Sequence, residues 1–178
     1  HARLDDIRDL MAYLASLPAV EGKAPAHDLA FPFSVRRFVG IWKALFLDTT
    51  PLVSDPSKSE SWNRGRYLAD ALGHCAECHS PRNAQGAIVQ EQRYAGGPDP
   101  EGHGWIPNIT AKGLGSWSKA DVSELLSTGF TPEFDSVGSS MADVVKNMAA
   151  LPKTDRDAIA EYLKSLPAID GPPKPHKR

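Results

Sequence analysis

The stretch Cys75-Ala76-Glu77-Cys78-His79 places two thiols and an imidazole within five residues. Two cysteines three apart, followed directly by a histidine, form the attachment signal for a c-type haem. The thiols can add to the two vinyl groups of one haem, because this spacing puts both sulfurs on one side of a helical turn. His79 is then expected as the proximal iron ligand. Since the chain contains only two cysteines, we expect one covalently bound haem c per chain.

Three other functions are known for such a pair of cysteines. A thioredoxin-like redox centre requires alternating strands and helices, and no such pattern is visible. A structural zinc site requires four ligands, whereas Cys75, Cys78 and His79 supply three. A simple disulfide leaves His79 without a role. Covalent haem attachment accounts for all three residues, and we therefore prefer it.

Composition and charge limit the partners of the chain. The formal net charge of −2 over 178 residues argues against nucleic acid binding. No apolar stretch approaches the roughly 20 residues that span a bilayer, and the longest, 39–47, contains Lys43. We therefore expect no transmembrane segment in this chain. Haem c is attached on the oxidising side of a membrane, so we expect a periplasmic protein, or one held at the outer face of the cytoplasmic membrane by a partner, with its leader removed.

Hydrophobic periodicity predicts helices and no convincing strand. The segment 80–117 is rich in glycine and proline and is expected to form a long loop that wraps around the haem. Capping-box patterns at 118–121 and 154–157 predict the starts of the last two helices. The fold class is therefore predicted to be all-α, with a class I cytochrome c-like fold and long haem-wrapping loops. The expected helices cover residues 4–17, 33–47, 62–73, a segment from Ser118 to Gly129, and a segment from Thr154 to Pro167.

The two ends of the chain share a sequence pattern. Residues 6–20 match residues 155–169 at a constant offset of 149, as between Tyr13 and Tyr162, and both stretches contain Ser-Leu-Pro-Ala. Two unrelated helices are not expected to share that ending, so we interpret the match as a duplicated domain. The counterpart of Cys75 in the first copy would then lie before residue 1.

This interpretation divides the chain into four parts. Residues 1–22 are expected to be the terminal helix of a first, otherwise absent cytochrome c domain. Residues 23–61 form an interdomain linker with a short helix, and residues 62–169 form the cytochrome c domain. The proline- and lysine-rich residues 170–178 are expected to be a disordered tail. On this interpretation the chain is a fragment or a degenerate relative of a dihaem protein.

A low-spin electron carrier needs a second axial iron ligand, and methionine in that position raises the reduction potential. Met141 follows three small residues, Gly138, Ser139 and Ser140, which would let the backbone approach a haem face. Met148 lies inside a helical pattern, where core packing explains it. We therefore favour His79 and Met141 as the metal ligands.

Further residues are expected near the haem. The carbonyl of Pro81, two residues after His79, is predicted to accept the proton of the outer imidazole nitrogen. Arg82 is a candidate partner for a haem propionate, although a solvated surface role is equally open. The other candidates for the haem edge, for which ordinary core packing also remains open, are Trp105, Asn108, Ile109 and Trp117.

From about residue 5 to 169 the sequence resembles the multihaem cytochrome c subunits of bacterial quinoprotein alcohol dehydrogenases and gluconate dehydrogenases. The resemblance implies that the methionine before the final helices, Met141 here, is the distal ligand. The haem motif alone is generic, whereas the linker and the Pro-Asn-Ile-Thr segment are more specific. The stretches that carry the resemblance include Phe31–Arg36, Trp42, Phe46, Trp62–Gly65, Gly73–Asn83, Tyr94–Gly97, Gly104–Thr110, Trp117–Ser118 and Gly129–Pro132.

The leading functional hypothesis is a carrier of single electrons, not an enzyme. The resemblance implies a dihaem relay between a dehydrogenase and the respiratory chain, with a dehydrogenase, another cytochrome, a quinone-linked complex or an oxidase as redox partner. The alternative is a haem enzyme, a peroxidase or sulfur-compound oxidoreductase, that acts at an exchangeable distal iron site. It would need acid–base groups such as Glu101 and His103 near the iron.

Overall fold

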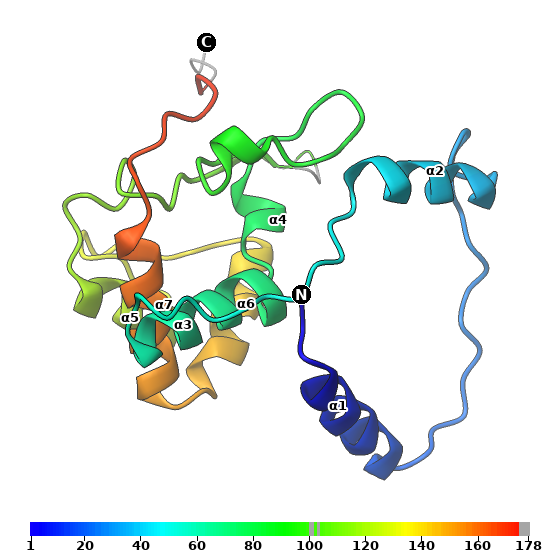
Figure 1. The fold of residues 1–178 in the computed structure, drawn as a ribbon, viewed down its shortest axis with the longest axis horizontal. Coiled ribbons are helices and arrows are strands. Elements are labelled where there is room, and N and C mark those ends of the chain that lie inside the picture. Colours follow the sequence, from blue (N-terminus) through cyan, green and yellow to red (C-terminus); the bar gives the residue numbers. More distant parts are fainter. Residues whose placement is uncertain (100–101, 103, 175–178) are drawn as a thin grey trace. The chain divides into compact units, whose positions relative to one another are not determined.

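The computed structural model describes residues 1–99, 102 and 104–174. It contains two compact units, His1–Leu52 and Val53–Arg178. Most of the regular structure among the described residues is helical (Figure 1). One short antiparallel sheet accompanies the helices. None of the helices described is long and apolar enough to cross a bilayer. The chain is therefore mainly helical, as its sequence predicts.

The first unit contains two helices, α1 (Leu4–Ser16) and α2 (Arg36–Phe46), joined by an extended segment. The helix predicted at 4–17 is confirmed to within one residue. The helix predicted at 33–47 begins later, because residues 31–34 form a turn. Neither helix contains a buried residue. Most apolar side chains of both helices are therefore exposed to solvent, whereas Val39 and Trp42 are half-buried.

In the second unit, α3 (Glu60–Tyr67) crosses α7 (Lys153–Ser165) at very close range. A Cβ atom on Gly65 would lie 1.9 Å from the carbonyl oxygen of Ala158, so only glycine permits this approach. Beside the crossing, the rings of Trp62 and Tyr162 pack edge to face with their centroids 5.3 Å apart. This crossing is the centre of the second unit.

The helical path that leads to Cys75 changes its hydrogen-bond pattern before it ends. After α3 the chain continues as a π-helical turn, Leu68–Leu72. The Gly73 amide donates to the carbonyl oxygen of Leu68 at 2.7 Å, which is the wider spacing of a π-helix. The predicted helix at 62–73 is therefore present, but it consists of an α-helical and a π-helical part.

Helix α5 (Lys119–Thr128) has the ends that the sequence predicts. The Ser118 hydroxyl accepts from the Asp121 amide, and the Asp121 carboxylate accepts from the Ser118 amide, so the capping box is present. Gly129 ends the helix with a φ of 80°, a left-handed conformation that glycine adopts at little cost.

Helix α7, which follows α6 (Ser140–Ala149), begins differently. Pro152 precedes its first residue, Lys153, and no side chain caps the helix. The capping box predicted at 154–157 is therefore wrong. The Asp157 carboxylate instead accepts hydrogen bonds from Lys153 at 2.8 Å and from Ser123 on α5 at 2.6 Å, so it joins two helices.

The expectation that the chain contains no strand also needs correction. Strand β1 (Gly97–Pro98) pairs antiparallel with β2 (Trp105–Ile106), with Gly97 opposite Ile106. Strands of two residues are too short to show an alternating pattern, which is why the sequence does not reveal them. The remainder of the described part of 80–117 is loop and turn, with a short 3₁₀ helix at Gln90–Gln92, as predicted.

The hydrophobic core of the second unit joins the π-helical turn, the loop around Tyr94, α5 and α7. Half-buried apolar side chains, among them Met141 and Met148 of α6, pack against it. The buried members are Leu68, Ala69, Ala76, Tyr94, Leu114, Val122, Leu126, Ile159, Ala160, Tyr162 and Leu163.

The segment after α7 stays attached to the second unit. The side-chain amide of Gln92 donates to the carbonyl oxygen of Asp170 at 3.1 Å. A Cβ atom on Gly171 would lie 2.1 Å from the carbonyl oxygen of Ala95. The tail predicted to be disordered at 170–178 therefore begins with two residues that contact the loop at 92–95, and its last part lies outside the described residues.

Candidate functional site

The attachment motif forms a single helical turn. Cys75 precedes α4 (Ala76–His79) and already has helical backbone angles. The His79 amide donates to the Cys75 carbonyl oxygen at 3.0 Å. Cys75 is half-buried, Cys78 is exposed, and both are free thiols rather than a disulfide. Two thiols on one turn beside a histidine fit the attachment of one planar haem.

The environment of Cys75 keeps its sulfur protonated. Burial raises the pKa of the Cys75 thiol to about 11, and the nearby Asp70 carboxylate contributes to the increase. A thiol in such a site is a poor thiolate nucleophile. This disfavours the thioredoxin-like alternative, in which one cysteine of the pair must ionise readily.

His79 is buried and oriented by a backbone carbonyl. Its Nδ1 lies 2.8 Å from the carbonyl oxygen of Pro107, and because a carbonyl only accepts, Nδ1 must carry the proton. Burial lowers the pKa of the imidazole, although the bond to Pro107 opposes this change. The ring is therefore neutral at pH 7, and its Nε2 has the lone pair that an iron ligand needs.

The prediction that Pro81 orients His79 is wrong. The Pro81 carbonyl oxygen accepts from the Val89 amide at 3.0 Å, whereas Pro107, 28 residues beyond His79, supplies the partner of the imidazole. Pro81 is buried and acts by packing, because a Cβ atom on Gly97 would lie 3.2 Å from its Cα atom.

Gly96 allows the Pro107 segment to approach His79. Its amide donates to the carbonyl oxygen of His79 at 2.8 Å. A Cβ atom at this position would lie 2.6 Å from the Ile106 carbonyl oxygen and 2.7 Å from the Asn108 nitrogen, and the φ of Gly96 is 73°. A side chain at residue 96 would therefore push away the loop that orients the imidazole.

Asn108, predicted as a pocket residue, anchors this loop. Its Oδ1 accepts from the amide of Thr110 at 2.9 Å and from the Thr110 hydroxyl at 2.7 Å. Its Nδ2 donates to the carbonyl oxygen of Ile169 at 2.8 Å. Asn108 therefore holds the segment after Pro107 in a turn and ties it to the segment that follows α7.

The structure places the other predicted pocket residues in the same unit without joining them into one site. Arg82 forms an ion pair with Glu77 at 2.7 Å and donates to the Gly86 carbonyl oxygen at 2.7 Å. Ile109 and Trp117 are half-buried against the hydrophobic core. Trp105 is half-buried in β2. Their roles toward a haem remain predictions.

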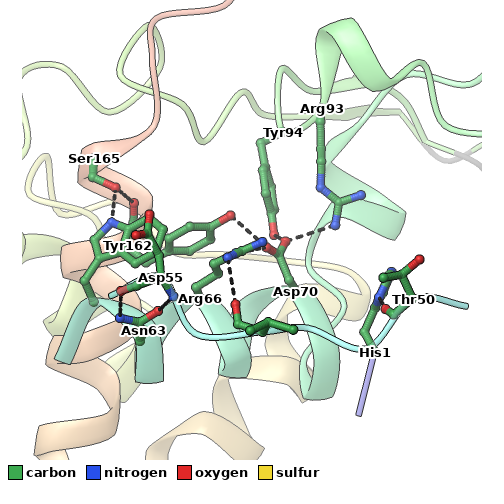
Figure 2. A network of polar contacts seen from close by, with 12 residues as sticks. His1, Thr50, Asp55, Asn63, Arg66, Asp70, Arg93, Tyr94, Tyr162 and Ser165 are labelled. Carbon is green, nitrogen blue, oxygen red and sulfur yellow. Dashed lines mark hydrogen bonds and ion pairs between the residues drawn. The ribbon is translucent and has the colours of Figure 1, made fainter. Parts of the chain in front are cut away.

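Sequence reasoning missed a buried carboxylate close to the motif. Asp70, on the π-helical turn, accepts from the hydroxyl of Tyr94, from the hydroxyl of Tyr162 at 2.8 Å and from Arg93 at 2.9 Å, with Arg66 at 3.8 Å (Figure 2). The side chains that donate to this carboxylate come from positions up to 92 residues away in the sequence. No short motif marks such a cluster.

The Asp70 carboxylate influences the pKa values of its hydrogen-bond partners. Burial, together with the Asp70 charge, raises the pKa of the Tyr94 and Tyr162 hydroxyls, so both remain protonated donors. Burial is the largest influence on Arg93 and disfavours its charge, but the hydrogen bond to Asp70 and the negative charges of its neighbours together outweigh burial and raise the pKa of the guanidinium. The network thus joins one carboxylate to two guanidinium groups, those of Arg93 and Arg66.

Met141 and Met148 lie seven residues apart on α6 and therefore on similar sides of it. Both are half-buried and pack against the core. The Met148 methyl lies 3.7 Å from the position of a Cβ atom on Gly73, close to the motif. The choice between the two sulfurs as iron ligand remains a prediction.

The alternatives of a zinc site and of a haem enzyme gain no support. In the described part of the chain, no three His, Cys, Asp or Glu side chains gather as a metal-binding group, as zinc would require. Glu101 and His103, the proposed acid–base groups of a haem enzyme, lie outside the described residues.

No protein-family model matches the chain, but individual proteins do. It is 49% identical over 170 residues to a "Diheme cytochrome c-type" of Cereibacter sphaeroides, covering 96% of this chain and 57% of that protein. It is 40% identical over 169 residues to the "Fructose dehydrogenase cytochrome subunit" of Gluconobacter japonicus, covering 92% of this chain and 34% of that protein. It is 35% identical over 180 residues to the "Alcohol dehydrogenase (quinone), cytochrome c subunit" of Gluconobacter oxydans, covering 93% of this chain and 37% of that protein.

The chain spans little more than half of the first of these proteins and about a third of the others. Their names describe cytochromes and cytochrome subunits, which are electron-transfer components rather than catalytic subunits. This agrees with the prediction that the chain is not itself an enzyme. With the motif on one helical turn and a neutral, oriented histidine beside it, the comparison identifies this chain as a homologue of dihaem cytochromes c and of the cytochrome c subunits of bacterial dehydrogenases.

Proposed function

We propose that this chain carries single electrons through one haem c that is covalently attached to Cys75 and Cys78 and ligated by His79 and Met141. The haem would supply the reversible one-electron chemistry of its iron. The observation that carries the proposal is His79, which follows the two thiols on one turn and donates from Nδ1 to Pro107. The protein would supply the ligands, their orientation and an apolar surrounding.

Met141 is proposed as the sulfur ligand because of its position on α6. It lies in the first turn of that helix, directly after a glycine and two serines, and is half-buried against the core. Ser139 has a φ of 53°, so the chain reverses sharply before the methionine. Met148 is deeper in the helix, where packing beside Gly73 accounts for it.

We further propose that the haem belongs to a relay of at least two haems. Helix α7 buries Ile159, Tyr162 and Leu163 in its own unit. Their counterparts, which lie 149 residues earlier on α1, have exposed fractions of one half or more. In this proposal α1 has the place of α7 in a first haem domain. The dihaem name of one relative supports the idea. The exposed counterparts, in order, are Leu10, Tyr13 and Leu14.

The proposed partner is a dehydrogenase that reduces the relay, with a quinone-linked complex or another cytochrome as acceptor. Relatives that are named as cytochrome subunits of fructose and alcohol dehydrogenases support a partner of this class. The proposed location is the periplasm or the outer face of the cytoplasmic membrane, because haem c is attached on that side.

One experiment tests the central proposal. The chain is produced in a host that attaches haem c, extracted with acidified acetone, and weighed by mass spectrometry. We expect the polypeptide to be heavier by the mass of one haem. We expect this increment to be absent from the double variant Cys75→Ala with Cys78→Ala. Haem that leaves with the solvent, or a mass increase of two haems, would contradict the assignment.

A further inference from the structure

The apolar residues of α2 form a continuous exposed face. Phe38, Ile41 and Leu45 recur at intervals of three and four residues, which places them on one side of a helix. Their exposed fractions are 44%, 59% and 70%. The exposed Phe46 and the half-buried Trp42 extend the face, with ring centroids 5.6 Å apart. An exposed aromatic and aliphatic surface of this kind normally has a binding partner.

The charged residues of α2 all have the same sign. Arg36, Arg37 and Lys43 are cationic, and no Asp or Glu occurs from residue 29 to residue 47. Arg36 and Lys43 are seven residues apart and therefore lie on similar sides of the helix, whereas Leu45 is two and a half turns from Arg36 and points the opposite way. The helix thus has an apolar face and a purely cationic face.

The first helix of the same unit provides a contrast. Helix α1 also exposes an apolar face, including Leu10 and Leu14. Its charged residues, however, are mostly acidic: it contains Asp5, Asp6 and Asp9 and a single arginine. An anionic surface would repel α1 and attract α2. Charge therefore separates two helices that exposure alone does not distinguish.

We propose that α2 is a membrane-surface helix that binds an anionic lipid bilayer. Aromatic and aliphatic residues opposite Lys and Arg are the composition of helices that lie in the plane of the head groups. At 11 residues, α2 is far shorter than the roughly 20 residues that cross a bilayer, so it lies along the surface. This proposal is independent of the haem assignment.

The test measures binding of the haem-loaded chain to vesicles by sedimentation. One set of vesicles is phosphatidylcholine and the other is phosphatidylcholine mixed with phosphatidylglycerol. We expect binding to the anionic set that weakens as salt is added. Arg36→Gln with Lys43→Gln should lower the partition coefficient roughly fivefold per cation. Ile41→Glu with Leu45→Glu should lower it by about tenfold or more.

The matched control is Leu10→Glu with Leu14→Glu in α1, which adds the same charges to an equally exposed apolar face and should leave binding unchanged. Visible absorbance and helical content confirm that each variant is folded. No binding of the unaltered chain to anionic vesicles, or an equal loss in the α1 control, would overturn the proposal. So would α2 variants that retain vesicle binding but lose self-association or binding of a dehydrogenase, because a protein would then occupy this face.

Discussion

The proton on Nδ1 of His79 connects the backbone of one loop to the donor strength of the imidazole. A carbonyl that accepts this proton makes Nε2 a stronger ligand, and a stronger ligand stabilises the oxidised iron. In the proposed haem site, the 2.8 Å bond to Pro107 would therefore lower the reduction potential of an iron bound at Nε2. Because Gly96 sets the position of this loop, residue 96 would influence the potential without contacting the iron.

We predict that Gly96→Ala raises the midpoint potential of the haem, because the added methyl would displace the Ile106–Asn108 backbone and weaken the bond between Pro107 and His79. Redox titration followed by visible absorbance measures the change. Gly86→Ala is the matched control, since Gly86 has a φ of 78° but no atom within 4 Å of its Cβ position. An equal rise in both variants would show that backbone strain, not loop position, is responsible, and no rise in Gly96→Ala would contradict the prediction.

Met141→Ala is expected to abolish the weak red absorption band that reports a sulfur–iron bond and to lower the midpoint potential, because thioether ligation raises it. Met148→Ala, on the same helix and similarly half-buried, should retain the band and lose stability by about 2–5 kcal/mol. The reverse pattern would assign Met148 as the ligand.

Asp70 should contribute to stability through its two tyrosine partners and Arg93. Asp70→Asn retains the shape of the side chain but removes the charge, and we expect the free energy of unfolding to fall by about 2 kcal/mol. Tyr162→Phe should cost about 1 kcal/mol. Urea unfolding measures both. A change of a few tenths of a kcal/mol in Asp70→Asn would show that solvent replaces the network.

At the scale of elements, the crossing of α3 and α7 depends on the absence of a single atom. Gly65→Ala would place a methyl 1.9 Å from a backbone oxygen, which no rotamer change can relieve. We predict a loss of about 3 kcal/mol in unfolding free energy. Gly40→Ala, in α2 with nothing within 4 Å of the Cβ position, should be neutral or mildly stabilising. Equal changes in unfolding free energy in the two variants would mean that helix propensity, not the close crossing, determines the effect of Gly65→Ala.

Helix α7 also makes the stability of the second unit dependent on pH. Hydrogen bonds from Arg64, from Lys153 and from Ser61 are the main reasons that the pKa values of Asp155, Asp157 and Glu161, respectively, are lowered. The folded state therefore binds fewer protons than the unfolded state, so these bonds stabilise the fold above about pH 4 and are lost as the pH falls through the lowered values.

We expect the unfolding free energy to fall between pH 5 and pH 3, values that bracket the ordinary carboxyl pKa of about 4. Asp155→Asn with Asp157→Asn and Glu161→Gln should be less stable at neutral pH and show a flatter dependence on pH. Urea unfolding at a series of pH values measures the slope. An unchanged slope in the triple variant would assign the acid sensitivity to other carboxylates.

Local patterns predicted those elements whose causes are local. The capping box at Ser118 and the glycine stop at Gly129 involve neighbours in sequence, and the structure contains both. The orientation of His79 depends on Pro107, 28 residues away, and no spacing rule indicates which carbonyl folds back. The same reason explains why Asp70, whose partners are spread over the second unit, was not foreseen. The two strands were missed for another reason, because two residues are too few to show an alternating pattern.

At the scale of the whole chain, the two units differ in how they use apolar residues. All buried members of the hydrophobic core belong to the second unit, and neither helix of the first contains a buried residue. We predict that removal of residues 1–52 leaves the absorption spectrum and the urea unfolding midpoint of the second unit unchanged. A clear shift in either would reveal a stabilising contact with the first unit.

The π-helical turn Leu68–Leu72 has a consequence for the spacing of the chain. A π-helical turn contains one more residue than an α-helical turn, so between the Gly65 crossing and Cys75 the chain carries one residue beyond a regular helix. Loss of one residue from a regular α-helix rotates everything after it by about 100°. The π-helical turn already holds its additional residue within a single turn, so deletion of Ala71 would restore α-helical geometry with a much smaller rotation. Both thiols and the imidazole would then keep roughly their direction relative to the crossing. Sequences related to this one should therefore tolerate loss of one residue in this turn more readily than loss of one residue inside α3.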